Sequence, residues 1–364
     1  MLGKISSFNI VFGITYLLLS TSVGIGAEPS DQAREHYLKG YELQKSRKYR
    51  DAVIEFEQAI TAYPNYGEAY FLLGHCYHTL TNYDRSIKSF KSALDLDYLP
   101  KKSKKALAIV YPKAAAFNFQ RGKFNEAIIK YEEALQLDTK IHKATLFYQL
   151  GLAYGKSNRE KEAIQSLINA TQEDPKFVKA HKKLGDIYQR RREFVAAANS
   201  YSHAIETDSS FTPAYGGLAR TKFATENIEG VIKLMHEAVS INPDYTDGHL
   251  LLGTALIQMG RQHEALKPLK KAVDLDANNA EIHFRLGEAL YGIGDYREAR
   301  ASSERALRID KDLARAQSLL GDAHFKLGEL QEAKMWYLKA QENSRFRDYA
   351  IDKLDEIDRL KNSR

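Results

Sequence analysis

The sequence predicts an all-α fold, an α-solenoid of nine helix-turn-helix repeats. Three observations favour this class. Most of the 364 residues fall into a 34-residue period, small residues recur at fixed places in it, and apolar residues stand between them at helical spacing. We number the repeat from 1 to 34. Position 27 is alanine in every repeat: Ala59, Ala93, Ala134, Ala170, Ala204, Ala238, Ala272, Ala306 and Ala340.

The first 27 residues differ from the repeats that follow. Lys4 is their only charged residue, Ile10–Leu19 is an apolar run, and small residues follow as far as Ala27. This order is typical of a secretory signal peptide, so we expect cleavage after Ala27 and an exported protein, periplasmic or secreted. The alternative is an uncleaved N-terminal membrane anchor, because residues 5–27 are uncharged and long enough to cross a bilayer.

The charge of the chain does not favour a nucleic acid as its partner. The 53 Lys and Arg residues are interspersed with 47 Asp and Glu, which leaves a formal charge of +6 without a concentrated basic patch. Cys76 is the only cysteine, so no disulfide can form within the chain. We expect Cys76 to be buried as a small apolar residue and the protein to depend on packing for its stability.

Each repeat carries two helical stripes. Positions 4, 7, 8 and 11 lie on one side of a first helix, and positions 17, 20, 24 and 27 lie on one side of a second. Glycine at position 8 and small residues at 20 and 27 let the two helices approach closely, while large residues at position 24 fill the space between them. The repeats are 33–66, 67–100, 108–141, 144–177, 178–211, 212–245, 246–279, 280–313 and 314–347.

The regular spacing is interrupted before the third repeat and ends after the ninth. Seven extra residues precede the third repeat, and seven residues are two helical turns, so we expect a lengthened helix near 100–121. Pro100 is placed to start this helix and Pro112 to kink it. Residues 348–364 keep the helical apolar spacing, which predicts a capping helix and tail that cover the last repeat.

The recurring positions resemble the tetratricopeptide repeat family over about 315 residues, from 33 to 347. The resemblance implies helix pairs stacked into a right-handed superhelix with a concave groove. The family often has tryptophan at position 4. We therefore interpret the histidines at this position as replacements for a packing aromatic ring and not as a histidine cluster: His36, His181, His249 and His283.

One binding mode of the family is not expected. Family members that hold the C-terminal Glu-Glu-Val-Asp of cytosolic chaperones carry lysine at position 5 and asparagine at position 9, followed by further basic and amide residues. Here Lys182 at position 5 is followed by Asp186 at position 9, which has the wrong charge, and no three consecutive repeats carry the set.

The resemblance places positions 2, 5, 9, 12 and 13 of the first helix on the concave surface. In the first four repeats these positions are rich in aromatic side chains, which can anchor a peptide or a partner helix. The alternative is that the rings pack against the first helix of the neighbouring repeat. The candidate groove residues are Tyr37, Tyr41, Phe71, His75, His78, Phe119 and Tyr148.

Two groups of basic residues are further candidates. The fifth repeat adds Lys179, Lys182 and Arg190 to the expected groove, which favours acidic side chains or a terminal carboxylate on the ligand. A second group lies at the start of the lengthened helix, where it can contact an anionic membrane surface or an acidic partner. The alternative for both groups is a solvated helix face. The second group is Lys101, Lys102, Lys104 and Lys105.

The sequence carries no catalytic motif. It has no phosphate-binding glycine loop, no nucleophile elbow and no cysteine pair. His75 and His78 stand three residues apart on one helix face, but the repeat places no third ligand beside them, so we expect no metal site. We also expect no cofactor.

The sequence therefore predicts a non-enzymatic scaffold or adaptor. It would bind an extended peptide or a helix of a partner protein in the groove, in the assembly of an envelope or secretion complex. Two alternatives stay open: a lumenal or periplasmic co-chaperone, and a polysaccharide-associated binding factor, since aromatic rings also stack on sugars.

Overall fold

A computed structural model of the chain describes residues 28–137 and 142–362, and within these residues it contains helices and turns but no β-strand. The predicted all-α class is therefore confirmed. The expected signal peptide in residues 1–27 lies outside the described residues, as do the end of the third predicted repeat (138–141) and the last two residues of the tail.

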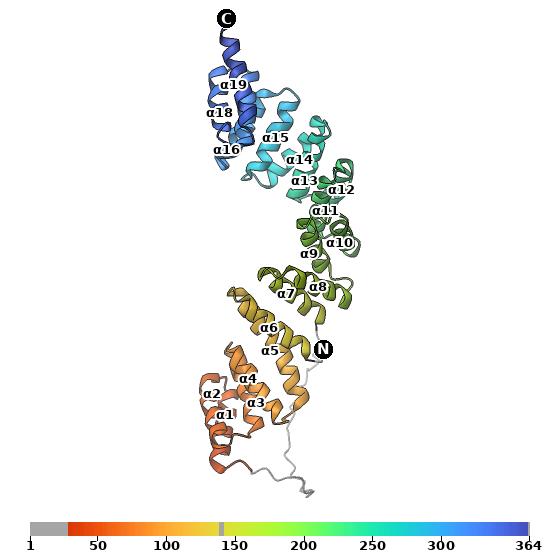
Figure 1. Ribbon diagram of the computed structural model, residues 1–364. Helices are drawn as coiled ribbons and strands as arrows, with labels where there is room; N and C mark the ends of the chain where they lie inside the picture. Colours follow the sequence, from red (N-terminus) through yellow and green to blue (C-terminus); the bar gives the residue numbers. More distant parts are fainter. Residues whose placement is uncertain (1–27, 138–141, 363–364) are drawn as a thin grey trace, which may run out of the picture. The chain divides into compact units, whose positions relative to one another are not determined.

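The chain divides into two compact units, residues 1–113 and 114–364. Within the described part of the first unit, consecutive helices pack against one another from the first to the fourth (Figure 1). The boundary falls inside the fifth helix, after Lys113 and one residue beyond Pro112, whose nitrogen cannot donate a helical hydrogen bond. The helices are α1 (Asp31–Lys45), α2 (Tyr49–Ala62), α3 (Gly67–Thr79), α4 (Tyr83–Asp95) and α5 (Pro100–Gln120).

The second unit continues the helix pairs, and within its described residues each helix from α6 to α19 packs against the next. The sixth to twelfth helices are α6 (Phe124–Gln136), α7 (Lys143–Lys156), α8 (Glu160–Glu173), α9 (Val178–Arg190), α10 (Phe194–Thr207), α11 (Thr212–Ala224) and α12 (Ile228–Ile241). The others are α13 (Thr246–Gln258), α14 (Gln262–Leu275), α15 (Ala280–Gly292), α16 (Tyr296–Ile309), α17 (Ala314–Lys326), α18 (Leu330–Ala340) and α19 (Arg347–Asn362).

Glycine at position 8 sets the spacing of the two helices in a repeat. A Cβ atom added to Gly185 would lie 2.7 Å from the ring of Tyr201 at position 24, and one added to Gly253 would lie 2.4 Å from Leu269. Both distances are too short for a real Cβ, so the helices could not keep their separation. The alanines at position 27 are buried in all nine repeats. The predicted arrangement of small and large residues is confirmed.

The turn inside each repeat uses a left-handed residue at position 15. Glycine takes this position in four repeats, for example Gly294 with φ +87°, but the other five use Arg47, Thr81, Asn158, Arg192 and Glu226. The turn is closed by the amide of position 16, as where Glu193 N donates to the carbonyl of Tyr188 at 2.9 Å. The repeat therefore keeps one turn geometry even where the sequence has no glycine.

Helix α19 covers the last repeat. Its Ala350 and Ile357 are fully buried, and the Tyr349 hydroxyl donates to the carboxylate of Asp322 in α17 at 2.7 Å. The Tyr337 hydroxyl of α18 donates to the same oxygen at 2.7 Å. Burial raises the pKa of Asp322, although both hydroxyls oppose the shift. One carboxylate thus connects the last two helices of the final repeat with the capping helix.

Candidate functional site

Aromatic rings from four repeat positions form one cluster in the first unit. The ring of Tyr37 in α1 lies 6.4 Å from that of Tyr41 and 5.0 Å from that of Tyr66, which precedes α3. The ring of Phe71 in α3 lies 5.9 Å from that of Tyr98, which precedes α5. We call this set the aromatic cluster; with His75 it comprises Tyr37, Tyr41, Tyr66, Phe71, His75 and Tyr98.

A single carboxylate joins the two halves of the aromatic cluster. Glu68, at the start of α3, is hydrogen-bonded to the hydroxyls of Tyr37 and Tyr98. Burial, reinforced by the charge of Glu68 and its hydrogen bond, raises the pKa of Tyr98 to about 12 and shifts the pKa of Tyr37 in the same direction. Both phenols therefore stay protonated at physiological pH, in the form that can donate to Glu68.

The members of the cluster differ in how far they reach solvent. Tyr37 and Phe71 are half-buried because each also packs on the large residue at position 24, Phe56 and Phe90 respectively. Tyr41 is 38% exposed and lies at the edge of the cluster. His75 is exposed as well, although neighbouring groups partly desolvate its imidazole and lower its pKa.

His78 does not join the cluster. Its Nε2 lies 3.1 Å from the Nζ of Lys113, and its ring faces Tyr83 at 6.2 Å. Partial burial, and secondarily the charge of Lys113, lower the pKa of His78. A neutral imidazole that accepts from a lysine is occupied by that contact. Among the described residues, no group of three His, Cys, Asp or Glu side chains is placed to hold a metal ion.

Two candidate aromatics lie in the second unit, where both are half-buried. The ring of Phe119 packs on that of Phe124 at 5.2 Å. The ring of Tyr148 packs on that of Phe177 at 5.1 Å, and burial raises the pKa of Tyr148. Both rings have a packing role within the unit, so Tyr41 and His75 remain the most accessible aromatic side chains of the candidate set.

The predicted set of groove residues omitted the aromatic residues at position 34 of the repeat. Tyr66 and Phe177 occupy position 34 of their repeats, and each packs on the position-5 ring of the preceding first helix. Tyr245 repeats the pattern, since its hydroxyl would lie 2.5 Å from a Cβ on Gly216 at position 5. Aromatic residues at position 34 recur in the sequence, and this periodic signal could have identified the partners of Tyr37 and Tyr148.

The basic candidates of the fifth repeat are largely paired. Lys182 Nζ lies 2.9 Å from Asp186, and Arg190 lies 3.6 Å from Glu160 in α8. Lys179 is exposed, and the described residues supply it with no ion pair. The predicted basic band therefore reduces to Lys179 and an exposed Arg190.

Charged residues at the same positions of later repeats bridge consecutive first helices. Arg220 in α11 lies 3.1 Å from Asp247 in α13, and Arg315 in α17 lies 2.6 Å from Glu281 in α15. Arg285 adds a second contact to Glu281 at 2.9 Å. These contacts satisfy the charges within the unit, so this surface is polar and largely neutralised, in contrast to the aromatic cluster.

The four lysines at the start of α5 are exposed. Between them Ser103 is buried, and its hydroxyl donates to the carbonyl of Tyr98 at 2.9 Å, which caps the turn before the helix. No ion pair within the described residues neutralises this group. The exposed set is Lys101, Lys102, Lys104 and Lys105.

The histidines at position 4 have a role beyond packing. His181 and His249 each place Nε2 2.9 Å from the carbonyl at position 32 of the preceding repeat, on Pro175 and Pro243. His283 makes the same contact with Ala277 at 3.0 Å. These side chains tie the end of one repeat to the first helix of the next. His36 departs from the pattern and contacts Glu55 at 2.8 Å.

Cys76 is fully buried, as predicted, and burial raises the pKa of its thiol to about 12. A thiol with such a pKa is protonated at physiological pH and is a poor nucleophile. Over the described ranges 28–137 and 142–362, none of the helices is sufficiently long and apolar to span a membrane.

Family models match four stretches of the chain. A model described as TPR repeat matches residues 253–294, and models described as tetratricopeptide repeat match residues 37–97, 144–177 and 284–348. A curated relative, the Hsp70-Hsp90 organising protein of Plasmodium falciparum, is 29% identical over 174 residues, which are 48% of this chain and 29% of the relative. The chain thus spans less than a third of the length of that relative.

Two solved structures have a similar fold. The pilF protein of Pseudomonas aeruginosa is 19% identical with a TM-score of 0.51, and the match covers 58% of this chain and 99% of that one. The Cut9-Hcn1 hetero-tetramer of the APC/C is 14% identical with a TM-score of 0.50, over 89% of this chain and 84% of that one. At these identities the likeness shows the fold alone.

Proposed function

Because this chain belongs to the tetratricopeptide repeat family, we propose that it is a non-enzymatic scaffold that binds a peptide or a helix of a partner protein. The aromatic cluster is the observation that carries the proposal. Its inner rings are held by packing and by Glu68, while Tyr41 and His75 reach solvent. Rings that are already fixed lose little conformational entropy on binding and offer a large apolar area to a ligand.

The surface of the later repeats, whose charges are paired with one another, is a less favourable place for a ligand than the aromatic cluster. The ion pairs of Arg220 with Asp247 and of Arg315 with Glu281 would have to be broken or desolvated by a ligand that lay on them. Contact with the aromatic cluster removes apolar surface from water without that penalty. An apolar side chain of the partner, on a helix or an extended segment, is therefore the expected anchor.

The first prediction concerns recovery of the partner. Replacing Tyr41 and His75 together with alanine is expected to reduce the amount of cross-linked partner by about tenfold, because accessible aromatic anchors dominate binding free energy. The measurement is quantitative mass spectrometry of affinity-purified full chain after cross-linking in cells. Far-UV circular dichroism checks that the variant is folded.

A matched control lies on the same helix. Leu38 in α1 is an exposed apolar residue outside the cluster, and Leu38→Ala is expected to leave partner recovery unchanged. If the Tyr41→Ala/His75→Ala protein is folded and recovers as much partner as the wild type, the aromatic cluster is not the binding surface.

One relative is named for organising Hsp70 and Hsp90. This chain, however, lacks the residues with which family members hold the C-terminal Glu-Glu-Val-Asp of cytosolic chaperones. Lys182 at position 5 is bound to Asp186 at position 9 at 2.9 Å, and Asp186 also accepts from the Tyr201 hydroxyl at 2.8 Å. A carboxylate ligand would meet a negative charge at this place. The alternative of a co-chaperone that binds chaperone tails in this way is therefore not favoured.

We further propose that the protein acts outside the cytoplasm, in the assembly of an envelope or secretion complex, on the basis of the N-terminal segment. The second prediction is that the mature protein begins at Glu28, because the small residues before it suit a signal peptidase. Intact mass spectrometry of protein from its native compartment measures this. Leu18→Arg places a charge in the apolar run and is expected to retain the precursor in the cytoplasm.

Two results would contradict cleavage. A full-length chain in the cytoplasmic fraction would refute export. A full-length chain in the membrane fraction would show that residues 1–27 serve as the anchor considered as the alternative. Lys4→Arg keeps the positive charge and is expected to leave processing unchanged, so it controls for substitution as such.

A further inference from the structure

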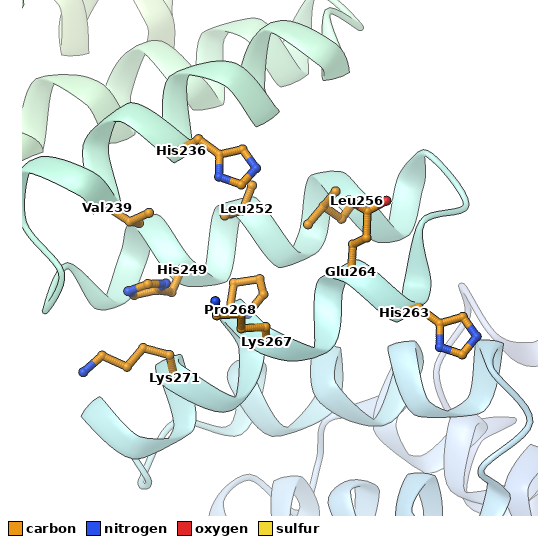
Figure 2. A pocket seen from close by; sticks show the side chains of 10 residues that line it. All are labelled: His236, Val239, His249, Leu252, Leu256, His263, Glu264, Lys267, Pro268 and Lys271. Carbon is orange, nitrogen blue, oxygen red and sulfur yellow. The ribbon is translucent and has the colours of Figure 1, made fainter.

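A cavity of about 530 Å³ in the second unit has an apolar lining. It lies between the second helices of two consecutive repeats, α12 and α14, and Figure 2 shows the side chains around it. Leu252 and Leu256 of α13 and Pro268 of α14 are its buried members, and Val239 adds a half-buried wall. Mainly apolar cavities of roughly 300 to 1,000 Å³ with few polar groups are typical of small-molecule sites.

His249 adds to the apolar lining although it is a polar residue. Its Nε2 donates to the carbonyl of Pro243 at 2.9 Å, and its Nδ1 is sealed from solvent. Neither nitrogen is available to a ligand, so the ring offers only carbon atoms to the cavity. This lining favours an apolar body for the ligand.

An equivalent cavity in the first unit has a different chemistry. The cavity between α2 and α4, of about 600 Å³, is lined largely by the same repeat positions. There the hydroxyl of Tyr77 at position 11 donates to Glu57 at position 25, and Arg85 donates to the same hydroxyl at 3.1 Å. In the α12–α14 cavity these two positions hold Leu256 and His236. The apolar character of this cavity is therefore a property of its own sequence and not of the repeat.

The rim of the α12–α14 cavity carries one positive charge that no carboxylate neutralises. Lys267 is exposed, and the described residues provide it with no ion pair. The other charges of the rim are compensated, because Lys271 is bound to Asp244 at 3.1 Å and Glu264 is bound to Arg261 at 2.7 Å. A ligand with a single negative charge would therefore balance the rim.

An apolar body and one negative charge together define the class of ligand. A carboxylate on an alkyl chain has both, since the chain covers the apolar lining and the carboxylate reaches Lys267. A phosphate monoester carries almost two charges at neutral pH, and the second would lie unpaired near Glu264. An extended peptide is less suitable, because its backbone N–H and C=O groups would be desolvated against the apolar lining.

We propose that the α12–α14 cavity binds an alkyl carboxylate of the fatty-acid type. The chain lies against Leu252, Leu256 and Pro268, and the carboxylate lies against Lys267. This second site takes a small molecule and not a protein. It goes beyond the proposed function and uses none of the residues of the aromatic cluster.

The third prediction is that decanoate binds to the full chain with a stoichiometry of one, as measured by isothermal titration calorimetry. Hexanoate is expected to bind at least about tenfold more weakly, because four fewer methylene groups leave water. Decanol has the same chain length without the charge and is expected to bind about fivefold more weakly than decanoate.

A matched pair of variants tests the cation. Lys267→Gln is expected to raise the dissociation constant of decanoate about fivefold, because the contact with the carboxylate is lost. Lys233 occupies the same repeat position in α12, is also exposed and does not line this cavity. Lys233→Gln is therefore expected to change the constant less than about twofold.

A second variant tests the apolar lining. Leu256→Tyr with His236→Glu introduces the residue pair of the α2–α4 cavity and is expected to weaken decanoate binding at least about tenfold, because polar groups and a negative charge enter the wall. Other repeats accommodate tyrosine at position 11, as Tyr77 and Tyr154. Far-UV circular dichroism checks folding. His236→Glu alone changes an exposed residue and is expected to weaken binding about fivefold, so the test does not depend on the double variant.

Several outcomes would overturn the proposal. Equal effects of Lys267→Gln and Lys233→Gln would show unspecific attraction by net charge. Unchanged binding by a folded Leu256→Tyr/His236→Glu protein would place decanoate elsewhere, and tighter binding of decyl phosphate than of decanoate would exclude the carboxylate as the preferred head group. Tyr41→Ala/His75→Ala is expected to leave decanoate binding unchanged, so a failure of the aromatic cluster and a failure of this cavity are distinguishable.

Discussion

Raising the pH from 9 to 11 is expected to lower the free energy of unfolding by about 4 kcal/mol through three buried tyrosines alone. Tyr131, Tyr154 and Tyr215 are at most 7% exposed, and burial raises the pKa of each to about 12. In the unfolded chain a tyrosine ionises near pH 10. Between these values the unfolded state releases protons that the folded state retains, so each pH unit removes about 1.4 kcal/mol per tyrosine.

The sign of the effect follows from the direction of the shift. The stabilising contribution is complete below pH 10 and is lost as the pH rises towards 12. Urea unfolding followed by far-UV circular dichroism at several pH values measures it, and the absorbance of tyrosinate reports ionisation in the folded protein. Tyr131→Phe is the most direct control, because burial alone shifts its pKa, and it is expected to reduce the pH dependence by about 1.4 kcal/mol per unit.

A folded protein whose tyrosines all titrate near pH 10 would contradict this account. So would a Tyr131→Phe protein with an unchanged dependence on pH. Either result would mean that these phenols remain hydrated in the native state, which is incompatible with the close packing of the repeats.

The helix pairs were predictable because their determinants are local and recur in register. Gly185 and Tyr201 lie at positions 8 and 24 of one repeat, and seeing the same pair of residue types elsewhere, as with Gly40 and Phe56, identifies the contact without a structure. The turn between the two helices of a repeat was harder to predict from the sequence. Thr81 and Glu226 take the left-handed conformation that glycine would favour, because the helices on both sides impose it.

The candidate site was predicted only in part because it depends on contacts between repeats. Tyr37 was predicted to be a groove residue, and the sequence did not identify its packing partner Tyr66, which belongs to the link that follows the second helix. Likewise, Arg220 is neutralised by Asp247, 27 residues later, and a count of charges along one helix face cannot show this pairing. The histidines at position 4 were interpreted as packing residues, and their bonds to the preceding turn emerged from the structure.

Replacing Tyr201 with alanine is expected to lower the free energy of unfolding by about 4 kcal/mol. The side chain is fully buried between two glycines, since a Cβ on Gly185 or on Gly217 would lie 2.7 or 2.3 Å from its ring. Glycines at these positions cannot fill the space that the ring leaves, so the variant keeps a cavity or forces α9 and α11 to move. Urea unfolding of the full chain followed by far-UV circular dichroism measures the loss.

Tyr201→Phe separates the ring from its hydroxyl. The hydroxyl lies 2.8 Å from Asp186 and 3.1 Å from Gln189, but Asp186 keeps its contact with Lys182, so this variant is expected to cost only about 1 kcal/mol. Val195→Ala, at an exposed position of the same helix, is expected to change stability by less than about 0.5 kcal/mol. If the alanine and phenylalanine variants lost the same free energy, the hydrogen bond and not the ring would set the separation of the helices, and the pairing of small and large residues would not explain the fold.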